Sequence, residues 1–262
     1  MPRMANPQGT PIWYELLTSD AKAASAFYER VVGWTIPAPA PTDPMAYWHI
    51  ETANGMVGGM MTLSNDMTSQ GARPTWLSYI AVDDVDATVK KAIEAGGKLL
   101  MPAMNLDKVG RFALIADPQG IPIYVMRGAS EETSHAFERT GMGKCNWNEL
   151  STPDQAVGNA FYTKVFGWTY PDKMSMGPMG DYMFIDAAGQ GIGATMPKQP
   201  DGHPGWTFYF RVPNIDEAVT KIAAAGGKVI VNPMEVPGGD RVLVAVDPQG
   251  VHFGLVAQGK PA

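Results

Sequence analysis

The sequence has little of what marks secreted, membrane or disulfide-bonded proteins. Its 262 residues include a single cysteine, Cys145, so no internal disulfide and no cysteine-based metal cluster can form. We expect this thiol to be a small, inert side chain. No apolar run approaches the roughly 18 residues that a membrane-spanning helix needs. The first seven residues hold no apolar core of the kind a secretory signal requires, so we expect a cytoplasmic protein.

Positive charge is also scarce. The chain has 20 Lys and Arg against 26 Asp and Glu, a formal net charge of −6, and no block of basic residues. An acidic chain without a basic patch does not suit a nucleic acid or an anionic membrane as partner. Because 45% of the residues are hydrophobic, the chain can bury a core, and we predict a globular protein.

Internal repetition is what the sequence has in abundance. The segment WYELLTSD at 13–20 returns as WNELSTPD at 147–154. The pairs FY at 27–28 and GW at 33–34 return in step with it, 134 positions later. Such recurrence at a fixed offset marks one structural unit that is written twice.

The later part of each copy repeats too, with GG at 96–97 and 226–227 and DPQG at 117–120 and 247–250. We therefore predict three segments: module 1 at residues 1–127, a polar linker with a short helical turn at 128–143, and module 2 at 144–262.

Within each module the pattern predicts a strand, a helix and three strands, twice over. In module 1, alternation over 11–17 indicates a strand, and a helix follows between a cap at Asp20 and a stop at Gly33. The other predicted elements are strands at 45–50, 56–63 and 76–82, a helix at 86–95, and strands at 99–101, 111–115 and 121–126. The same order recurs in module 2, so we predict an α+β fold.

These features resemble the glyoxalase, bleomycin-resistance and extradiol-dioxygenase superfamily, also called the vicinal oxygen chelate (VOC) fold. The resemblance rests on the paired βαβββ units, the FY and GW pairs after the first helix, and the DPxG turn before the last strand. It covers nearly the whole chain and implies that two βαβββ units in each module form a curved mixed sheet around a cavity. Members include metal-dependent lyases, isomerases, epimerases and dioxygenases as well as metal-free drug-binding proteins, so the fold does not fix the function.

The resemblance also implies three metal-ligand positions in each module. They fall on Trp13, Leu77 and Tyr124 in module 1 and on Trp147, Thr207 and Gly254 in module 2. None of the six is His, Glu, Asp or Cys, and an indole N–H has no lone pair to offer a metal. We therefore expect neither the superfamily's usual metal nor another cofactor.

Two glutamates, Glu15 and Glu149, lie two positions beyond the tryptophans and share their inward face. A carboxylate that faces an apolar cavity has its pKa raised, which suits a general base. Alternatively, each glutamate is satisfied by neighbouring donors and only braces the sheet. His252 has the inward parity of the last strand, so Glu149 with His252, and Glu15 with His49 or Tyr124, are the groups that could move a proton.

Other side chains are candidates for ligand contact. Arg111 and Arg241 are equivalent, and each could pair with a glutamate across the sheet or hold an anionic group. The 17 methionines either fill the core or, with nearby aromatic residues, line a hydrophobic pocket. The predicted ligand-binding residues are Trp13, Trp147, His49, Tyr124, Trp76, Trp206, Arg111 and Arg241.

The sequence favours a metal-free glyoxalase-like protein that binds a small apolar or aromatic molecule. It would sequester the molecule, or act as an isomerase or lyase with Glu15, Glu149 and His252 as catalytic residues. One alternative is a metal-dependent lyase, isomerase or dioxygenase with relocated ligands such as Glu15, His49, Glu149 and His252. Another is a protein-interaction module. The duplication predicts a monomeric pseudo-dimer or a homodimer.

Overall fold

A computed structural model describes residues 6–43 and 45–259 of the chain. Residues 1–5, on which part of the expectation about a secretory signal rests, lie outside these described residues, as do Pro44 and residues 260–262. Among the described residues, no helix is both long and apolar enough to cross a membrane.

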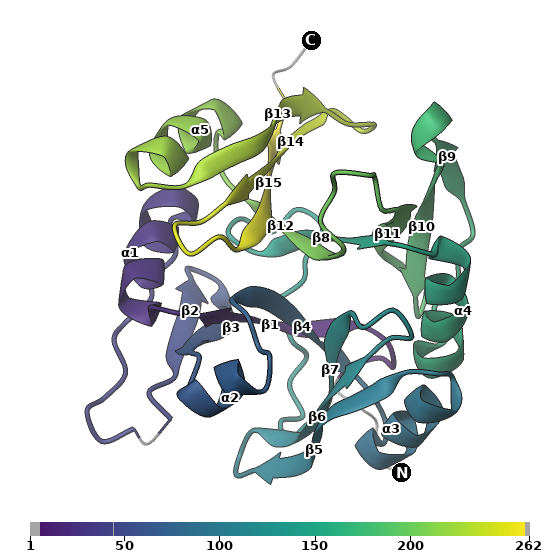
Figure 1. Cartoon of the computed structure of the whole chain (residues 1–262). Helices are drawn as coiled ribbons and strands as arrows, with labels where there is room; N and C mark the ends of the chain where they lie inside the picture. The colour runs from purple at the N-terminus through teal and green to yellow at the C-terminus, as the bar shows by residue number, and fades with distance from the viewer. Residues whose placement is uncertain (1–5, 44, 260–262) are drawn as a thin grey trace. The chain divides into compact units, whose positions relative to one another are not determined.

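The first module forms a seven-stranded mixed sheet in the order β2-β3-β1-β4-β7-β6-β5 (Figure 1). Its strands are β1 (Pro11–Thr18), β2 (Trp48–Thr52), β3 (Gly55–Thr62), β4 (Thr75–Ala81), β5 (Lys98–Leu106), β6 (Gly110–Ala116) and β7 (Pro122–Gly128). The pairs β1–β3 and β4–β7 are parallel, whereas β2–β3, β5–β6 and β6–β7 are antiparallel. Strand β5 runs beyond the predicted 99–101, because register shifts in its pairing let it follow β6 further.

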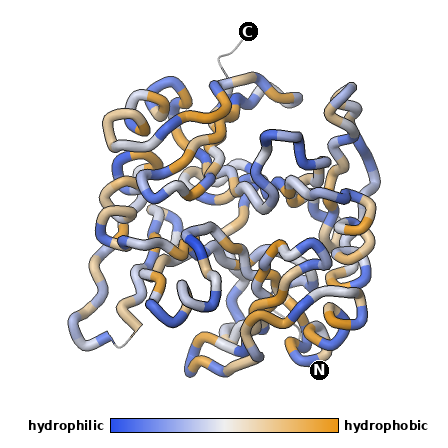
Figure 2. Tube along the Cα trace, in the orientation of Figure 1, coloured by the Kyte–Doolittle hydropathy of each residue, from blue (hydrophilic) through white to orange (hydrophobic). Residues whose placement is uncertain are grey.

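The second module repeats this order with one more strand, as β13-β14-β15-β12-β8-β11-β10-β9. Its strands are β8 (Cys145–Thr152), β9 (Lys173–Ser175), β10 (Asp181–Ala187), β11 (Gln190–Pro197), β12 (Gly205–Arg211), β13 (Lys228–Glu235), β14 (Asp240–Val246) and β15 (His252–Gln258). Apolar residues are concentrated along β13–β15 and along β5–β6 (Figure 2). The predicted α+β fold of two tandem modules, each with a mixed sheet, is confirmed. In module 1 only two strands, β2 and β3, follow α1, whereas three strands follow each of α3, α4 and α5.

Four helices of ten or twelve residues begin at side-chain caps. They are α1 (Ala21–Val32), α3 (Val85–Glu94), α4 (Gln155–Phe166) and α5 (Ile215–Ala224). The Asp20 side chain accepts a hydrogen bond from the Ala23 N–H, as predicted, and Asp84, Asp154 and Asn214 cap the others in the same way. Gly33 ends α1 in the left-handed conformation, with φ of 87°, which glycine adopts without steric cost.

A few short elements differ from the prediction. The sequence did not indicate the helix α2 (Asn65–Ser69), the 3-10 helix η1 (Gly177–Met179) or strand β9. Each spans five residues or fewer, too short for apolar periodicity to show. The helical turn predicted in the linker is absent, because residues 129–143 form bends and turns and no helix.

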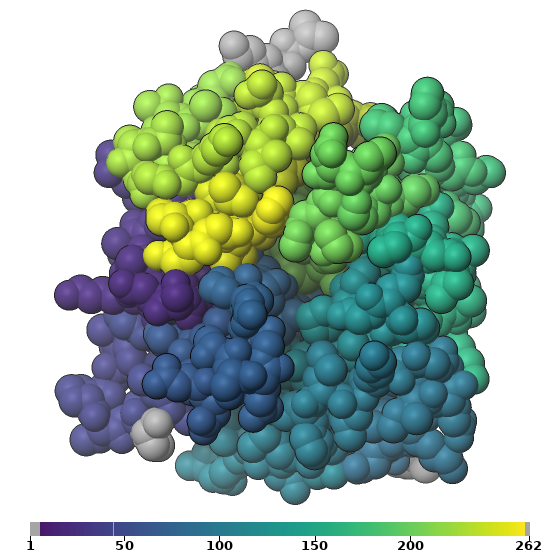
Figure 3. Space-filling model, viewed as in Figure 1, coloured from purple at the N-terminus to yellow at the C-terminus, as the bar shows by residue number. Residues whose placement is uncertain are grey.

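The two sheets follow the modules, but the packing of the chain does not. The chain forms two compact units, and each unit contains segments of both modules. Unit 1 comprises Leu77–Ser134, Asn148–Trp206 and the described part of Met1–Trp13, and unit 2 comprises Tyr14–Trp76, His135–Trp147 and the described part of Thr207–Ala262. Helix α3 packs on α4 in unit 1 and α1 on α5 in unit 2. In the space-filling view the purple surface of α1 borders the yellow-green surface of module 2 (Figure 3).

Within unit 2, the repeated motifs of one module meet those of the other. The Tyr28 hydroxyl of α1 donates a hydrogen bond to Asp247 Oδ2 at 3.1 Å and accepts one from Trp76 Nε1 at 3.0 Å. The Phe27 ring fills the space beside Gly227, since a Cβ added there would lie 2.8 Å from the ring. The FY pair of module 1 thus packs against the GG and DPQG segments of module 2.

Unit 1 makes the same contacts with the modules exchanged. The Tyr162 hydroxyl donates to Asp117 Oδ2 at 3.2 Å, and a Cβ on Gly97 would lie 2.7 Å from the Phe161 ring. The tryptophans of the GW pairs make equivalent hydrogen bonds in the two units. Trp34 Nε1 donates to the Gly143 carbonyl in unit 2, and Trp168 Nε1 donates to the Gly9 carbonyl in unit 1. The repeated motifs therefore hold the two modules to one another.

Candidate functional site

The predicted inward glutamates each accept a hydrogen bond from a tyrosine. In module 1, the Tyr47 hydroxyl, just before β2, donates to Glu15 Oε2 at 2.9 Å. In module 2, the Tyr182 hydroxyl of β10 donates to Glu149 Oε2 at 2.7 Å. We call each Glu–Tyr pair a half-site. Glu15 is only 4% exposed, whereas Glu149 is partly exposed.

Parallel strand pairing places a small residue opposite each glutamate. Glu15 on β1 lies opposite Gly59 on β3, and Glu149 on β8 lies opposite Ala194 on β11. The side chains of directly opposed residues share one face of a sheet. The residue opposite the glutamate therefore shapes the floor under each half-site.

A second ring stands beside each tyrosine. His49 lies opposite Gly59 in the sheet, and its ring packs edge-on to that of Tyr47 with centroids 5.4 Å apart. In module 2 the equivalent ring is Phe184, 5.7 Å from that of Tyr182. His49 is exposed and Phe184 partly exposed. The polar neighbour of module 1 is thus replaced by an apolar one in module 2.

The tyrosines were missed among the site residues predicted from sequence, although a signal for them existed. Tyr47 and Tyr182 recur 135 positions apart at the head of equivalent strands, but a buried core role explains a repeated aromatic residue equally well. Only the strand register shows that their hydroxyls reach the glutamates.

The remaining half of each sheet carries an apolar surface. On β4 and β7 of module 1, Tyr79 and Tyr124 stack with centroids 4.1 Å apart, and Phe112 packs beside them. In module 2 a glycine takes the place of Tyr124, and a Cβ on Gly254 would lie 2.4 Å from the Tyr209 ring. The structure thus places Tyr124 in an aromatic cluster of its own half-sheet.

His252 begins β15, opposite Val246, and is partly exposed. It belongs to unit 2, whereas Glu149 belongs to unit 1. Their predicted cooperation in proton transfer stays a prediction.

Trp13 and Trp147 occupy the family's first ligand position and are both partly exposed. The guanidinium carbon of Arg139 lies 4.5 Å from the ring centroid of Trp147, a cation–π contact. Both tryptophans remain accessible enough to contact a ligand.

Four of the predicted ligand-binding residues have other surroundings. Trp76 is 2% exposed, and its indole N–H donates to the Tyr28 hydroxyl. Trp206 is 9% exposed and packs against the rings of Tyr162 and Trp168. These two tryptophans belong to the core beneath the helices, because strand alternation places them opposite Tyr79 and Tyr209. Their burial accounts for Trp76 and Trp206 as core residues.

The arginines form ion pairs, but with helix residues and not with sheet glutamates. Arg111 Nε and Nη2 bond both carboxylate oxygens of Asp86 at 2.8 and 2.7 Å, and Arg241 Nη1 bonds Asp216 at 2.8 Å. The hydrogen bond and charge of Asp86 raise the pKa of Arg111, and those of Asp216 raise the pKa of Arg241. Each arginine links the first turn of a helix to its sheet, which corrects the expected glutamate partner.

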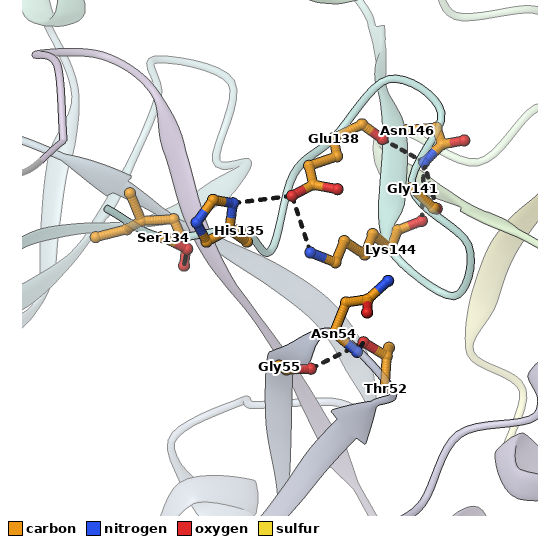
Figure 4. Close-up of polar contacts among 10 residues, drawn as sticks. Thr52, Asn54, Gly55, Ser134, His135, Glu138, Gly141, Lys144 and Asn146 are labelled. Atoms are coloured by element: carbon orange, nitrogen blue, oxygen red, sulfur yellow. Dashed lines mark hydrogen bonds and ion pairs between the residues drawn. The ribbon is translucent and has the colours of Figure 1, made fainter. Parts of the chain in front are cut away.

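A separate polar cluster precedes β8 (Figure 4). Glu138 Oε1 lies 2.9 Å from both Lys144 Nζ and His135 Nδ1. Burial alone would raise the pKa of Glu138, but the hydrogen bonds from Lys144 and His135 hold it below its usual value. The Lys144 side chain is only 2% exposed, and Asn146 Nδ2 binds carbonyls of this turn, including that of Gly141. The cluster braces the end of the linker.

The family's metal does not fit the residues present. The six ligand positions carry indole, isobutyl, phenol, hydroxyl and glycine groups in place of the usual imidazoles and carboxylates. Among the residues that the structure describes, no group of three or more His, Cys, Asp and Glu side chains is arranged to hold a metal ion.

The repeated strand-helix-strand units and the two mixed sheets are typical of a tandem protein of the vicinal oxygen chelate type. The sequence profile of the Glyoxalase/Bleomycin resistance protein/Dioxygenase superfamily matches residues 11–125 and 144–255, and the chain belongs to this family. The resemblance drawn from the sequence is confirmed.

Two relatives match nearly the whole chain over nearly their whole length. "Putative glyoxylase CFP32" of Mycobacterium tuberculosis is 35% identical over 257 residues, which cover 97% of this chain and 96% of that one. "Anthracycline biosynthesis protein DnrV" of Streptomyces peucetius is 30% identical over 273 residues, with the same shares covered.

Solved structures share the fold at low identity. The Mn(II)-bound glyoxalase from Novosphingobium aromaticivorans has a TM-score of 0.65 at 17% identity, covering 96% of this chain and 83% of that one. The 2,3-dioxygenase LapB from Pseudomonas sp. KL28 has a TM-score of 0.66 at 12% identity, covering 98% and 95%. At such identity the likeness shows the fold alone.

Proposed function

We propose that this protein binds a small apolar or aromatic molecule without a metal ion, and that the Glu–Tyr half-sites supply the polar contacts. The observation that carries the proposal is the repeated bond of Tyr47 to Glu15 and of Tyr182 to Glu149. A carboxylate has two oxygens with about four lone-pair sites, so it can accept hydrogen bonds from several donors at once, including a hydroxyl or N–H group of a ligand.

Apolar side chains of the sheets support this choice of ligand. In unit 1, which also contains the Glu149–Tyr182 half-site, the partly exposed residues around the Tyr79–Tyr124 stack are Met101, Phe112, Leu114 and Met126. Methionines adapt to ligands of varied shape, and aromatic rings favour planar molecules. A few polar groups among apolar residues are typical of small-molecule sites.

The names of the relatives agree with this class of ligand. One is named for glyoxylase activity and the other for the biosynthesis of anthracyclines, which are planar polycyclic aromatic compounds. Their similarity over nearly the full length supports a ligand with carbonyl or hydroxyl groups on an apolar frame.

Metal analysis of the purified protein tests the metal-free part of the proposal. After dialysis against a chelator and then against buffer, mass spectrometry should find Zn, Ni, Fe and Mn well below one equivalent per chain. Added divalent ions should leave the melting temperature unchanged. Stoichiometric metal that resists dialysis would contradict the metal-free proposal and favour a metal site with ligands at other positions.

Proton transfer is a second candidate, favoured by the donor on each glutamate. A hydrogen bond from a tyrosine keeps the carboxylate ionised and oriented, as a general base requires, although it also lowers the basicity of the carboxylate. The test is deuterium exchange into 2-tetralone, an apolar aromatic ketone with acidic C–H bonds. The wild-type protein should accelerate the exchange and the Glu15→Gln/Glu149→Gln double variant should not, whereas equal rates would exclude this activity for such ketones.

A further inference from the structure

The two half-sites have the same glutamate and tyrosine but differ in the residue beneath the tyrosine ring. In module 1 the ring of Tyr47 lies directly over Gly59. A Cβ added to Gly59 would lie 2.2 and 2.4 Å from two ring carbons of Tyr47 and 2.5 Å from its hydroxyl oxygen. Real Cβ atoms do not approach other heavy atoms so closely, so this ring position requires glycine.

Module 2 has Ala194 at the equivalent place, opposite Glu149. The Cβ of Ala194 excludes the ring position that Tyr47 adopts, so Tyr182 reaches Glu149 from a different position. Both hydroxyls still bond their glutamates, at 2.9 and 2.7 Å. The alanine therefore changes how the ring covers the carboxylate without breaking the bond.

The exposure of the two glutamates follows this difference. Glu15 is 4% exposed beneath Tyr47, whereas Glu149 beside Tyr182 remains partly exposed. The ring next to Tyr182 is that of Phe184, where module 1 has His49, so the tyrosine that bonds the partly exposed Glu149 packs against a second aromatic ring. Such a surface suits a planar ligand with one polar edge.

We propose that the two modules carry a closed and an open copy of the same half-site, and that the working ligand site is the open copy at Glu149 and Tyr182. The residue opposite the glutamate, Gly59 or Ala194, decides which copy is open. The ligand is a planar aromatic molecule whose hydroxyl donates to Glu149. The identity of the ligand rests on the proposed function. The difference in solvent access between Glu15 and Glu149 is independent of the proposed function.

Carboxyl labelling of the native protein tests the difference in access. The reagents are a water-soluble carbodiimide and glycine ethyl ester, with labelled glutamates quantified by peptide mass spectrometry. Glu149 should be labelled in the wild type and Glu15 protected. Ala194→Gly should reduce labelling of Glu149 to the level of Glu15, and Gly59→Ala should expose Glu15.

Gly128→Ala is the matched control, because a Cβ there meets nothing within 4 Å, and its labelling pattern should equal that of the wild type. Should Gly59→Ala fail to fold, Ala194→Gly still decides, since it only removes a methyl group. Equal labelling of Glu15 and Glu149 in the wild type, or unchanged labelling of Glu149 in Ala194→Gly, overturns the proposal.

Binding of 2,6-dihydroxyanthraquinone, whose hydroxyls have no acceptor within the molecule, separates this inference from the proposed function. The wild type should bind one equivalent, Ala194→Gly should lose that binding, and Gly59→Ala should gain a second equivalent. If the labelling pattern holds but no variant binds this probe, the open and closed copies stand and the proposed ligand class fails. If the probe binds the wild type and Ala194→Gly equally, the assignment of the site to module 2 fails.

Discussion

At the scale of single residues, the Tyr28 hydroxyl carries the contact between the modules in unit 2. It donates to Asp247 and accepts from Trp76, and all three side chains are buried. Tyr28→Phe leaves a buried carboxylate oxygen and a buried indole N–H without this partner. Each such loss costs about 1–3 kcal/mol, so we predict a decrease of that order in the free energy of unfolding, measured in urea.

Tyr170→Phe is the matched control for that substitution. The Tyr170 hydroxyl is buried and has no hydrogen-bond partner among the described residues. Removing it should leave the free energy of unfolding unchanged or increase it, because an unsatisfied buried hydroxyl is itself costly. Equal destabilisation by Tyr28→Phe and Tyr170→Phe would show that the hydroxyl bonds do not matter.

The turn aspartates predict an unusual dependence on pH. Burial raises the pKa of Asp117 and of Asp247, although turn N–H groups and the tyrosine hydroxyls act against it. The folded state therefore binds the proton more tightly than the unfolded state. The stability from this effect is present at low pH and is lost as pH rises through the folded pKa.

We therefore predict that wild-type protein loses stability relative to Asp247→Asn as pH rises from about 3.5 to 7. Urea unfolding of both proteins across this range measures the difference. A difference that grows in favour of the wild type would mean that the turn favours the charged carboxyl over the neutral one.

Sequence reasoning at this scale located Glu15 and Glu149 but not the groups that bond them. Strand alternation fixes which face a residue occupies, and this follows from a local pattern. The partnership of Tyr47 with Glu15 depends on the register of β2, β3 and β1, which no local pattern determines.

At the scale of elements, the second glycine of each GG pair sets how closely a helix from the other module can approach. A Cβ on Gly97 would meet the Ala116 carbonyl at 2.5 Å as well as the Phe161 ring, and one on Gly227 would meet the Val246 carbonyl at 2.8 Å. Overpacking of this kind costs about 1–3 kcal/mol. We predict that Gly97→Ala and Gly227→Ala each lower the free energy of unfolding by about this amount, measured in urea.

The Gly128→Ala variant again serves as control, because its added methyl group meets no atom within 4 Å. It should change the free energy of unfolding little. If Gly97→Ala is no more destabilising than Gly128→Ala, the helix contact is looser than the structure indicates.

Elements with strong start and stop signals could be predicted from the sequence. Asp20 and Gly33 bracket α1, and the structure shows both caps in place. The GG and DPQG segments had a role that local signals could not reveal. The sequence indicated only that they end a helix and form a turn within one module. In the structure they also contact the FY pair of the other module. The bonded residues are more than 40 positions apart in unit 1 and over 200 in unit 2.

At the scale of the whole molecule, the two modules depend on one another for core contacts. The partner of Tyr28 comes from module 2, and the partner of Tyr162 comes from module 1. Residues 1–127 alone would contain Tyr28 and also Asp117, the equivalent of Asp247. We predict that this isolated module associates into a homodimer, in which Asp117 of one copy accepts the hydrogen bond from Tyr28 of the other.

Sedimentation velocity measures this outcome. The isolated module should sediment as a dimer, and Tyr28→Phe should shift it toward unfolded monomer. A stable folded monomer of residues 1–127 would contradict the account, because it would show that the contacts between modules are dispensable.

The central claim is that a metal-free Glu–Tyr half-site binds an aromatic molecule. Isothermal titration calorimetry with 2,6-dihydroxyanthraquinone, in buffer that contains EDTA, tests it most directly. The account predicts saturable binding to the wild type that EDTA does not diminish and that Glu149→Gln weakens. No binding, binding only with added divalent ions, or equal affinity of the wild type and Glu149→Gln would contradict it.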